Sequence, residues 1–173
     1  DGQDPRPRPA ELAQAADRAH AAFVHPASDF LSLLKLWDFV HAEKARLSNN
    51  QFRKSCQKHF ISYPRLREWF DLHRQLADLA KQAGLKSSRR VGGEDGIDKV
   101  ADAVHRALLA GLLSNVALKT EAYEYTGAHD KKLRLWPGSA LAKIKIRPRW
   151  IVCAEIVATS QQFARTCAQI NPD

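Results

Sequence analysis

Residues 123 to 160 read Y-E-Y-T-G-A-H-D-K-K-L-R-L-W-P-G-S-A-L-A-K-I-K-I-R-P-R-W-I-V-C-A-E-I-V-A-T-S, and in this stretch the chain is no longer patterned for helices. Two alternating or β-branched runs lie at 131–136 and 150–159, with turn-forming residues at 126–127 before the first run and at 136–139 between the runs. Short runs of this kind are typical of strands. The remaining segments are patterned for helices, so the sequence predicts an α+β protein whose small β-unit follows a helical platform.

The charged residues in the central part of the β-unit are all basic. Between residues 131 and 149 there is no Asp or Glu, whereas the basic residues are Lys131, Lys132, Arg134, Lys143, Lys145, Arg147 and Arg149. Such a surface attracts polyanions, because binding releases the counterions held by their phosphates. An ordinary solvated loop is the alternative interpretation. Trp136 and Trp150 are able to stack on bases, although aromatic residues beside strands more often belong to a core.

The composition of the whole chain narrows the class of protein. The 173 residues suffice for one ordinary domain or two small ones, and a net charge of +8 favours nucleic acid or an acidic surface as partner. The cysteines Cys56, Cys153 and Cys167 form no C-x-x-C pair, so we expect no disulfide framework, no zinc site and a reducing, cytoplasmic location. No membrane-spanning run is present. The chain begins at Asp1 and contains no Met, so we expect a fragment of a longer protein.

Prolines, capping residues and apolar spacing predict the helices that precede the β-unit. Alternating prolines predict an extended arm over residues 1–9, and Ser28 or Asp29 is predicted to cap a helix beginning at Phe30. Apolar spacing predicts helices over 9–23, 30–47, 50–60, 63–84 and 97–112, with a flexible polar connection from Lys86 to Gly96. The candidate strands are 115–119, 123–126, 131–136, 150–159 and 163–170, and the last of these is equally compatible with a helix.

Catalytic signatures are absent from the sequence. It contains neither a G-x-x-x-x-G-K-[ST] phosphate loop nor an H-E-x-x-H metal motif, so we predict no catalytic, cofactor-binding or metal-binding residue. The helix expected to begin at Tyr63 carries Arg65 and Arg67 close to its start. Arginines beside the amides of a helix N-terminus can bind phosphate, and a solvated helix face is the commoner alternative.

Several motifs resemble those of DEAH-box RNA helicases. H-P-A-S-D-F-L-S-L-L-K-L-W (25–37), S-N-N-Q-F-R-K-S-C (48–56) and F-I-S-Y-P-R-L-R-E-W (60–69) are similar to the ratchet-like, helicase-associated domain of that family. H-R-A-L-L-A-G-L-L-S-N-V-A (105–117) resembles the last helix of that domain. E-Y-T-G-A-H-D (124–130), W-P-G-S-A-L (136–141) and W-I-V-C-A-E-I-V-A-T-S (150–160) resemble the OB-fold that follows it. The nearest likeness is to bacterial HrpA-type helicases.

The resemblance implies a division of the chain and a parent enzyme. It implies an arm and first helix at 1–24, a helical ratchet-like domain at 25–114 and an OB-fold β-barrel at 115–173. The family's RecA-like domains bind ATP and Mg²⁺ and act as a nucleoside triphosphate hydrolase, but their motifs are absent here. Gln161 follows Thr159 and Ser160 where many relatives carry a basic residue, so no phosphate contact is expected at that point.

Three functional hypotheses remain open at this stage. The resemblance favours an accessory part of an ATP-dependent RNA helicase that forms one wall of the single-stranded RNA channel, beside the RecA-like domains of the same parent chain. Its RNA-binding residues would be Arg65 and Arg67 together with the seven basic residues of the β-unit. The alternative is a protein–protein docking module that contacts the helicase core or a regulatory partner. A self-contained enzyme is the third, and no catalytic centre supports it.

Overall fold

The computed structural model describes residues 3–86 and 94–171. Contacts within it define two units, a helical unit of Asp1–Ala22 and Asp38–Val91 and a barrel unit of Phe23–Trp37 and Gly92–Asp173. Helix α2 (Asp29–Arg46) contributes its first half to the barrel unit and its second half to the helical unit. The domain boundaries expected after residues 24 and 114 stay a prediction, and the contacts add that residues 23–37 group with the barrel.

The helical unit begins with the arm predicted from the prolines. Its described residues, 3–9, form neither helix nor strand, and the carbonyl of Pro5 accepts a hydrogen bond from Ser62 N at 2.7 Å. Beyond the arm, the single helix expected over 9–23 is divided into a 3₁₀ turn (Ala10–Leu12), α1 (Ala13–His20) and a second 3₁₀ turn (Ala21–Phe23). The weak apolar face of this segment explains the division, since only Ala16 of α1 is buried.

Helices α3 (Asn49–Lys58) and α4 (Tyr63–Gln82) begin where their capping residues predict. Ser48 forms a capping box, because its Oγ accepts a hydrogen bond from Gln51 N while Gln51 Oε1 accepts one from Ser48 N at 3.0 Å. The chain leaves α3 through Phe60, which adopts a left-handed φ of 53° and therefore lies beyond the helix in which it was predicted. Gly84, with a φ of 74°, ends α4 as expected.

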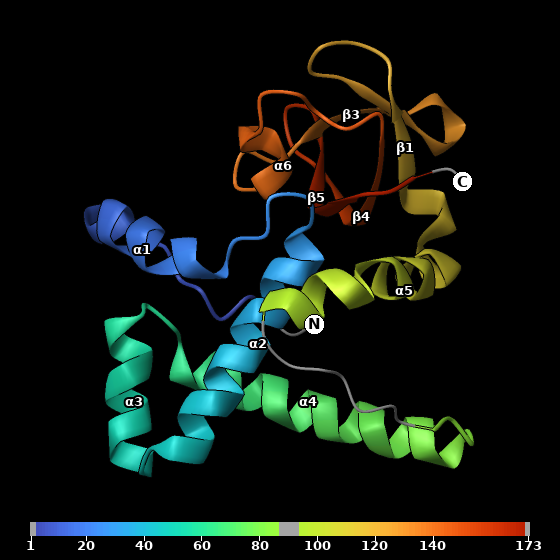
Figure 1. Cartoon of the computed structure of the whole chain (residues 1–173). Helices are drawn as coiled ribbons and strands as arrows, with labels where there is room; N and C mark the ends of the chain where they lie inside the picture. The colour runs from blue at the N-terminus through green and yellow to red at the C-terminus, as the bar shows by residue number, and fades with distance from the viewer. Residues whose placement is uncertain (1–2, 87–93, 172–173) are drawn as a thin grey trace. The chain divides into compact units, whose positions relative to one another are not determined.

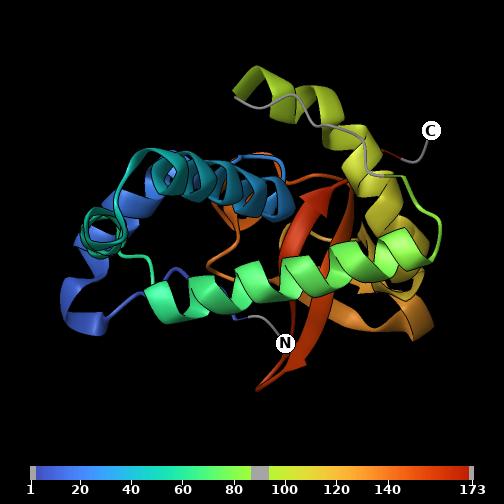
Figure 2. The ribbon, with the colours of Figure 1, turned by 90° about the horizontal axis from the view of Figure 1, so that it is seen from below.

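The apolar face of α4 is buried only near its start. Figure 2 shows α4 as one uninterrupted helix. Leu66 is fully buried, whereas Leu72, Leu76 and Leu79 are 40%, 55% and 58% exposed. The arm contacts the first two turns of α4, through Ser62, Arg65 and Trp69, which accounts for the burial there. The predicted apolar stripe is therefore real in sequence but largely solvent-facing in its second half.

The structure confirms the predicted fold class, a helical domain followed by an OB-fold barrel. Its strands are β1 (Val116–Lys119), β2 (Tyr125–Gly127), β3 (Lys132–Leu135), β4 (Trp150–Ala158) and β5 (Gln162–Gln169). They close in the order β1-β2-β3-β5-β4, with β3 and β5 parallel and the other pairs antiparallel. Figure 1 shows these strands gathered together, with β1, β3, β4 and β5 labelled. A closed five-stranded barrel with this Greek-key order is the OB-fold.

Side chains facing the barrel interior explain why these strands form. Alternation along β3 buries Leu133 and Leu135 and exposes Lys132 and Arg134. The buried cluster also includes Ala117, Tyr125, Ala140, Leu141, Ile151, Cys153, Ala164 and Cys167. The Tyr125 hydroxyl donates a hydrogen bond to the Pro148 carbonyl at 2.9 Å, and burial raises the pKa of Tyr125 to about 12. The tyrosine of the E-Y-T-G motif is therefore a core residue.

In the barrel unit the structure decides one open prediction, at β5, and differs from the sequence expectation at α6 and at the start of α5. The segment 163–170, which was compatible with strand or helix, is strand β5, because it pairs with β4 in antiparallel register from Ile151–Gln169 to Ala158–Gln162. A short helix, α6 (Ala140–Lys143), follows the 136–139 turn and was not predicted. Helix α5 (Glu94–Leu112) already includes Gly96, and residues 87–93 of the predicted polar connection lie outside the described residues.

Asp29 fastens the first turn of α2 to the barrel. Its carboxylate accepts hydrogen bonds from Ser139 Oγ at 2.6 Å, from Ala140 N at 2.9 Å and from Cys167 N at 2.8 Å. The cap of α2 is supplied by Ser28, whose Oγ accepts a hydrogen bond from Leu31 N at 3.2 Å. Next to this contact, Thr166 adopts a φ of 53°, which is rare for a β-branched residue and places strain beside the Asp29 hydrogen bond.

Candidate nucleic-acid interface

The seven basic residues predicted on the β-unit all belong to the barrel unit. Lys131 precedes β3, Lys132 and Arg134 lie on its outward face, and the other four lie between the end of α6 and the start of β4. Six of the seven are exposed, and Arg147 is half-buried. β3 positions its cations because the intervening leucines fill the core.

Two of these seven cations are engaged within the barrel. Lys132 Nζ lies 3.0 Å from Glu124 Oε1 and donates a hydrogen bond to Thr126 Oγ1 at 3.1 Å. Arg147 donates to the carbonyl of Ala142 at 3.2 Å, and its guanidinium lies 4.5 Å from the ring centroid of Tyr123. Within the described part of the chain, no carboxylate pairs with the other five, which are Lys131, Arg134, Lys143, Lys145 and Arg149. These five provide the positive charge available to a ligand.

The two arginines predicted on the helical side have different environments. Arg65 is half-buried and donates from Nη1 to the carbonyl of Asp4 at 3.0 Å, so it holds the arm against α4. Arg67 is exposed and lines a shallow groove at the start of α4. Arg53, which sequence reasoning missed, lines the same groove and lies 4.9 Å from the ring centroid of Tyr63. Arg53 and Gln57 lie one turn apart on α3 and both line the groove, so helical spacing was the signal that could have identified Arg53.

A group of aromatic and basic side chains on the outer face of β3 and β5 was only partly predicted. The Trp136 and Phe163 rings lie edge-to-face, with centroids 5.4 Å apart and an interplanar angle of 87°. The guanidinium of Arg165 lies 5.2 Å from the Trp136 ring centroid. Trp136 was considered for base stacking from the sequence. Phe163 and Arg165 were not, because their position beside Trp136 depends on the pairing of β3 with β5.

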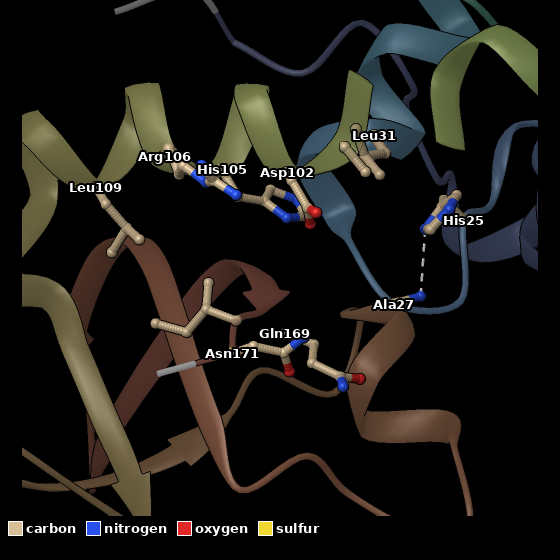
Figure 3. A pocket seen from close by; sticks show the side chains of 11 residues that line it. His25, Ala27, Leu31, Asp102, His105, Arg106, Leu109, Gln169 and Asn171 are labelled. Carbon is tan, nitrogen blue, oxygen red and sulfur yellow. Dashed lines mark hydrogen bonds between the residues drawn. The ribbon is translucent and has the colours of Figure 1, made fainter. Parts of the chain in front are cut away.

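A hollow in the barrel unit is lined by α5, the start of α2 with the residues before it, and the end of β5 (Figure 3). Two histidines point into it, and both are engaged. His25 Nε2 lies 3.0 Å from Asp98 Oδ1, and His105 Nε2 lies 2.9 Å from Ser28 Oγ. Burial lowers the pKa of His105, which favours its neutral form. These contacts join the segment that precedes α2 to α5. Among residues 3–86 and 94–171 no group of three His, Cys, Asp or Glu side chains is placed to hold a metal ion.

The three cysteines are buried thiols. Burial raises the pKa of Cys56 and of Cys153 to about 11 and raises the pKa of Cys167 further. A thiol with so high a pKa remains protonated near neutral pH and is a poor nucleophile. Their contribution is to core packing.

Comparison with known sequences agrees with this fold. The sequence model of the oligonucleotide/oligosaccharide-binding (OB)-fold matches residues 104–173. The chain is also 38% identical over 172 residues to the ATP-dependent RNA helicase HrpA homolog of Haemophilus influenzae and, equally, to the ATP-dependent RNA helicase HrpA of Escherichia coli. These alignments cover 99% of this chain and 12% of each helicase. The chain is similar to one segment of HrpA helicases.

The likeness to HrpA helicases covers both units of the chain. It extends across the helical unit as well as the barrel, whereas the OB-fold match begins within α5. The chain spans only about an eighth of the length of these curated relatives. None of the described helices is long and apolar enough to cross a membrane.

Proposed function

We propose that this chain is the accessory C-terminal part of an ATP-dependent RNA helicase, forms one wall of its single-stranded RNA channel and binds the RNA backbone. The observation that carries the proposal is the set of five cations on the OB barrel, Lys131, Arg134, Lys143, Lys145 and Arg149, that face no described acidic partner. The likeness to HrpA supports RNA as the polyanion, and the RecA-like domains of a longer parent would supply ATP hydrolysis with Mg²⁺.

The absence of neutralising carboxylates decides how strongly the barrel would bind phosphate. Each phosphate neutralised by Lys or Arg releases counterions, so binding weakens as salt rises. If about four phosphates of a single strand are contacted, log K falls with log salt at a slope of about −3. Measurement of oligouridine binding to the 173-residue chain by fluorescence anisotropy at several salt concentrations tests this. A slope near zero would contradict direct contact with the backbone.

Charge reversal locates the contact. In the variant Lys143→Glu/Lys145→Glu we expect the affinity for RNA to fall at least tenfold. The slope of log K against log salt should become less negative by the contribution of about two phosphate contacts. The matched control is Lys54→Glu/Lys99→Glu, which makes the same charge change on exposed positions of α3 and α5. An equal loss in both variants would indicate attraction by net charge alone and would remove the barrel loop from the proposed interface.

A second candidate function is docking to another part of the parent helicase or to a regulatory protein. The specific observation in its favour is the exposed face of α4, where Leu72, Leu76 and Leu79 are 40%, 55% and 58% exposed. Replacing Leu76 and Leu79 by Gln should leave the stability of the chain within about 0.5 kcal/mol, because both are surface positions. Loss of binding to separately produced RecA-like domains, with RNA binding unchanged, would favour docking.

A further inference from the structure

We infer that Trp136, Phe163 and Arg165 form a stacking subsite for a base of single-stranded RNA on the outer face of the barrel. The inference rests on the proposed function and adds to it a ligand class that the cation set does not address. Cations bind the phosphate backbone, whereas an exposed aromatic and guanidinium surface binds the π-face of a base.

Strand register places these side chains on one face. In the parallel pair of β3 and β5, Arg134 lies opposite Phe163, and Leu135 lies opposite Ala164. Leu135 and Ala164 are buried in the core, so Arg134 and Phe163 face outward. The pairing continues with a hydrogen bond of 2.9 Å from Trp136 N to the Ala164 carbonyl. Trp136 and Arg165 lie two residues beyond Arg134 and Phe163 and therefore extend the same outward face.

The Trp136 ring is fixed in position while remaining accessible. Phe163 meets it edge-to-face, and Arg165 lies over it at 5.2 Å. A Cβ atom at Gly138 would come within 3.1 Å of Trp136 Cδ1 and Nε1, so the glycine allows the indole to lie against its own turn. Trp136 nevertheless remains 37% exposed. A pre-ordered ring loses little conformational entropy when a base stacks on it.

The two arginines near the Trp136 ring, Arg165 and Arg134, have different charge environments and therefore different roles. Arg165 Nη1 lies 3.1 Å from Glu155 Oε1 on the neighbouring strand β4, and the two side chains are 45% and 54% exposed. That ion pair holds the guanidinium plane and offsets its charge, so Arg165 contributes a flat stacking surface more than a phosphate contact. Arg134 is exposed beside Phe163 and makes no ion pair with any described carboxylate, so it is placed to meet the phosphate next to a stacked base.

The test separates bases from phosphates. The probes are an oligouridine of about eight nucleotides, within the site size of one OB-fold, and a ribose-phosphate oligomer of equal length without bases. The wild-type chain should bind oligouridine about tenfold more tightly than the abasic oligomer. The variant Trp136→Ala should lose that preference and keep both the affinity for the abasic oligomer and its salt slope. Trp136→Phe should restore most of the preference.

Tyr123→Ala is the matched control, because Tyr123 is an exposed aromatic residue that also carries an arginine, Arg147, over its ring. A loss of oligouridine preference in Tyr123→Ala and not in Trp136→Ala would overturn the inference. Equal binding of both oligomers by the wild-type chain, with a clear salt slope, would overturn the stacking subsite and leave the proposed backbone binding intact. Absence of binding to either oligomer at low salt would contradict both proposals.

Discussion

The start of α4 and the outer face of β3 and β5 both combine arginine with tryptophan, and the structure uses the two pairs differently. At α4, Arg65 and Trp69 donate hydrogen bonds to the carbonyls of Asp4 and Gln3 at 3.0 and 3.1 Å. On the barrel, Trp136 packs against Phe163 and Arg165 and remains 37% exposed. The same residue types therefore hold an arm in one unit and form a candidate ligand surface in the other.

A neighbouring main-chain acceptor therefore determines whether an arginine or tryptophan holds a segment in place or remains available to a ligand. At α4 the acceptors are the carbonyls of Asp4 and Gln3, which precede Arg65 and Trp69 by 61 and 66 residues. Local sequence patterns do not reveal contacts over such a separation. A side chain that is hydrogen-bonded to a distant main-chain carbonyl should therefore control stability, and an exposed cation or ring without such an acceptor should control binding. Variants that change stability and binding separately test this distinction.

The largest effect is expected from Asp29→Ala. The substitution leaves the donors on Ser139, Ala140 and Cys167 without their carboxylate, and a buried unsatisfied donor costs about 1–3 kcal/mol. Partial access of water to the site lowers the sum, so we expect the free energy of unfolding to fall by about 3 kcal/mol. Urea unfolding followed by tryptophan fluorescence measures it. In the control Asp98→Ala, where the carboxylate is 74% exposed, the change should stay below about 1 kcal/mol.

Asp29 also marks the limit of what the sequence could predict. Helix starts, the capping box at Ser48, the end of α4 at Gly84 and four of the five strands followed from local patterns. The seven barrel cations could be named from charge alone. The triple acceptance by Asp29 and the meeting of Trp136 with Arg165 could not, because both depend on strand pairings between distant segments. The exposure of Leu76 was missed because apolar spacing along α4 does not show which part of that face has a packing partner.

An intermediate effect is expected from the neighbouring arginines of α4, which form a matched pair. Arg65→Ala removes a charge-assisted hydrogen bond to the Asp4 carbonyl, so the free energy of unfolding should fall by about 1.5 kcal/mol. Arg67→Ala alters an exposed side chain and should change it by less than about 0.5 kcal/mol. If Arg67 binds phosphate, its variant alone should weaken oligouridine binding at unchanged stability. A larger loss of stability in Arg67→Ala than in Arg65→Ala would contradict a stabilising role for the contact between Arg65 and the arm.

The smallest effect concerns Glu43 of the helical unit, whose pKa is lowered by hydrogen bonds from Ser55 and Arg46. A lowered carboxyl pKa contributes stability above its unfolded value of about 4.3 and loses it as the pH falls through the lower folded pKa. Ser55→Ala removes the hydroxyl that donates to Glu43 Oε2 at 2.5 Å. At pH 7 the variant should therefore be less stable than wild type by about 1 kcal/mol. Urea unfolding between pH 7 and pH 3 should show that difference shrinking in acid, because a protonated Glu43 accepts a weaker hydrogen bond. A difference that is constant with pH would mean that Ser55 acts through packing and not through the Glu43 carboxylate.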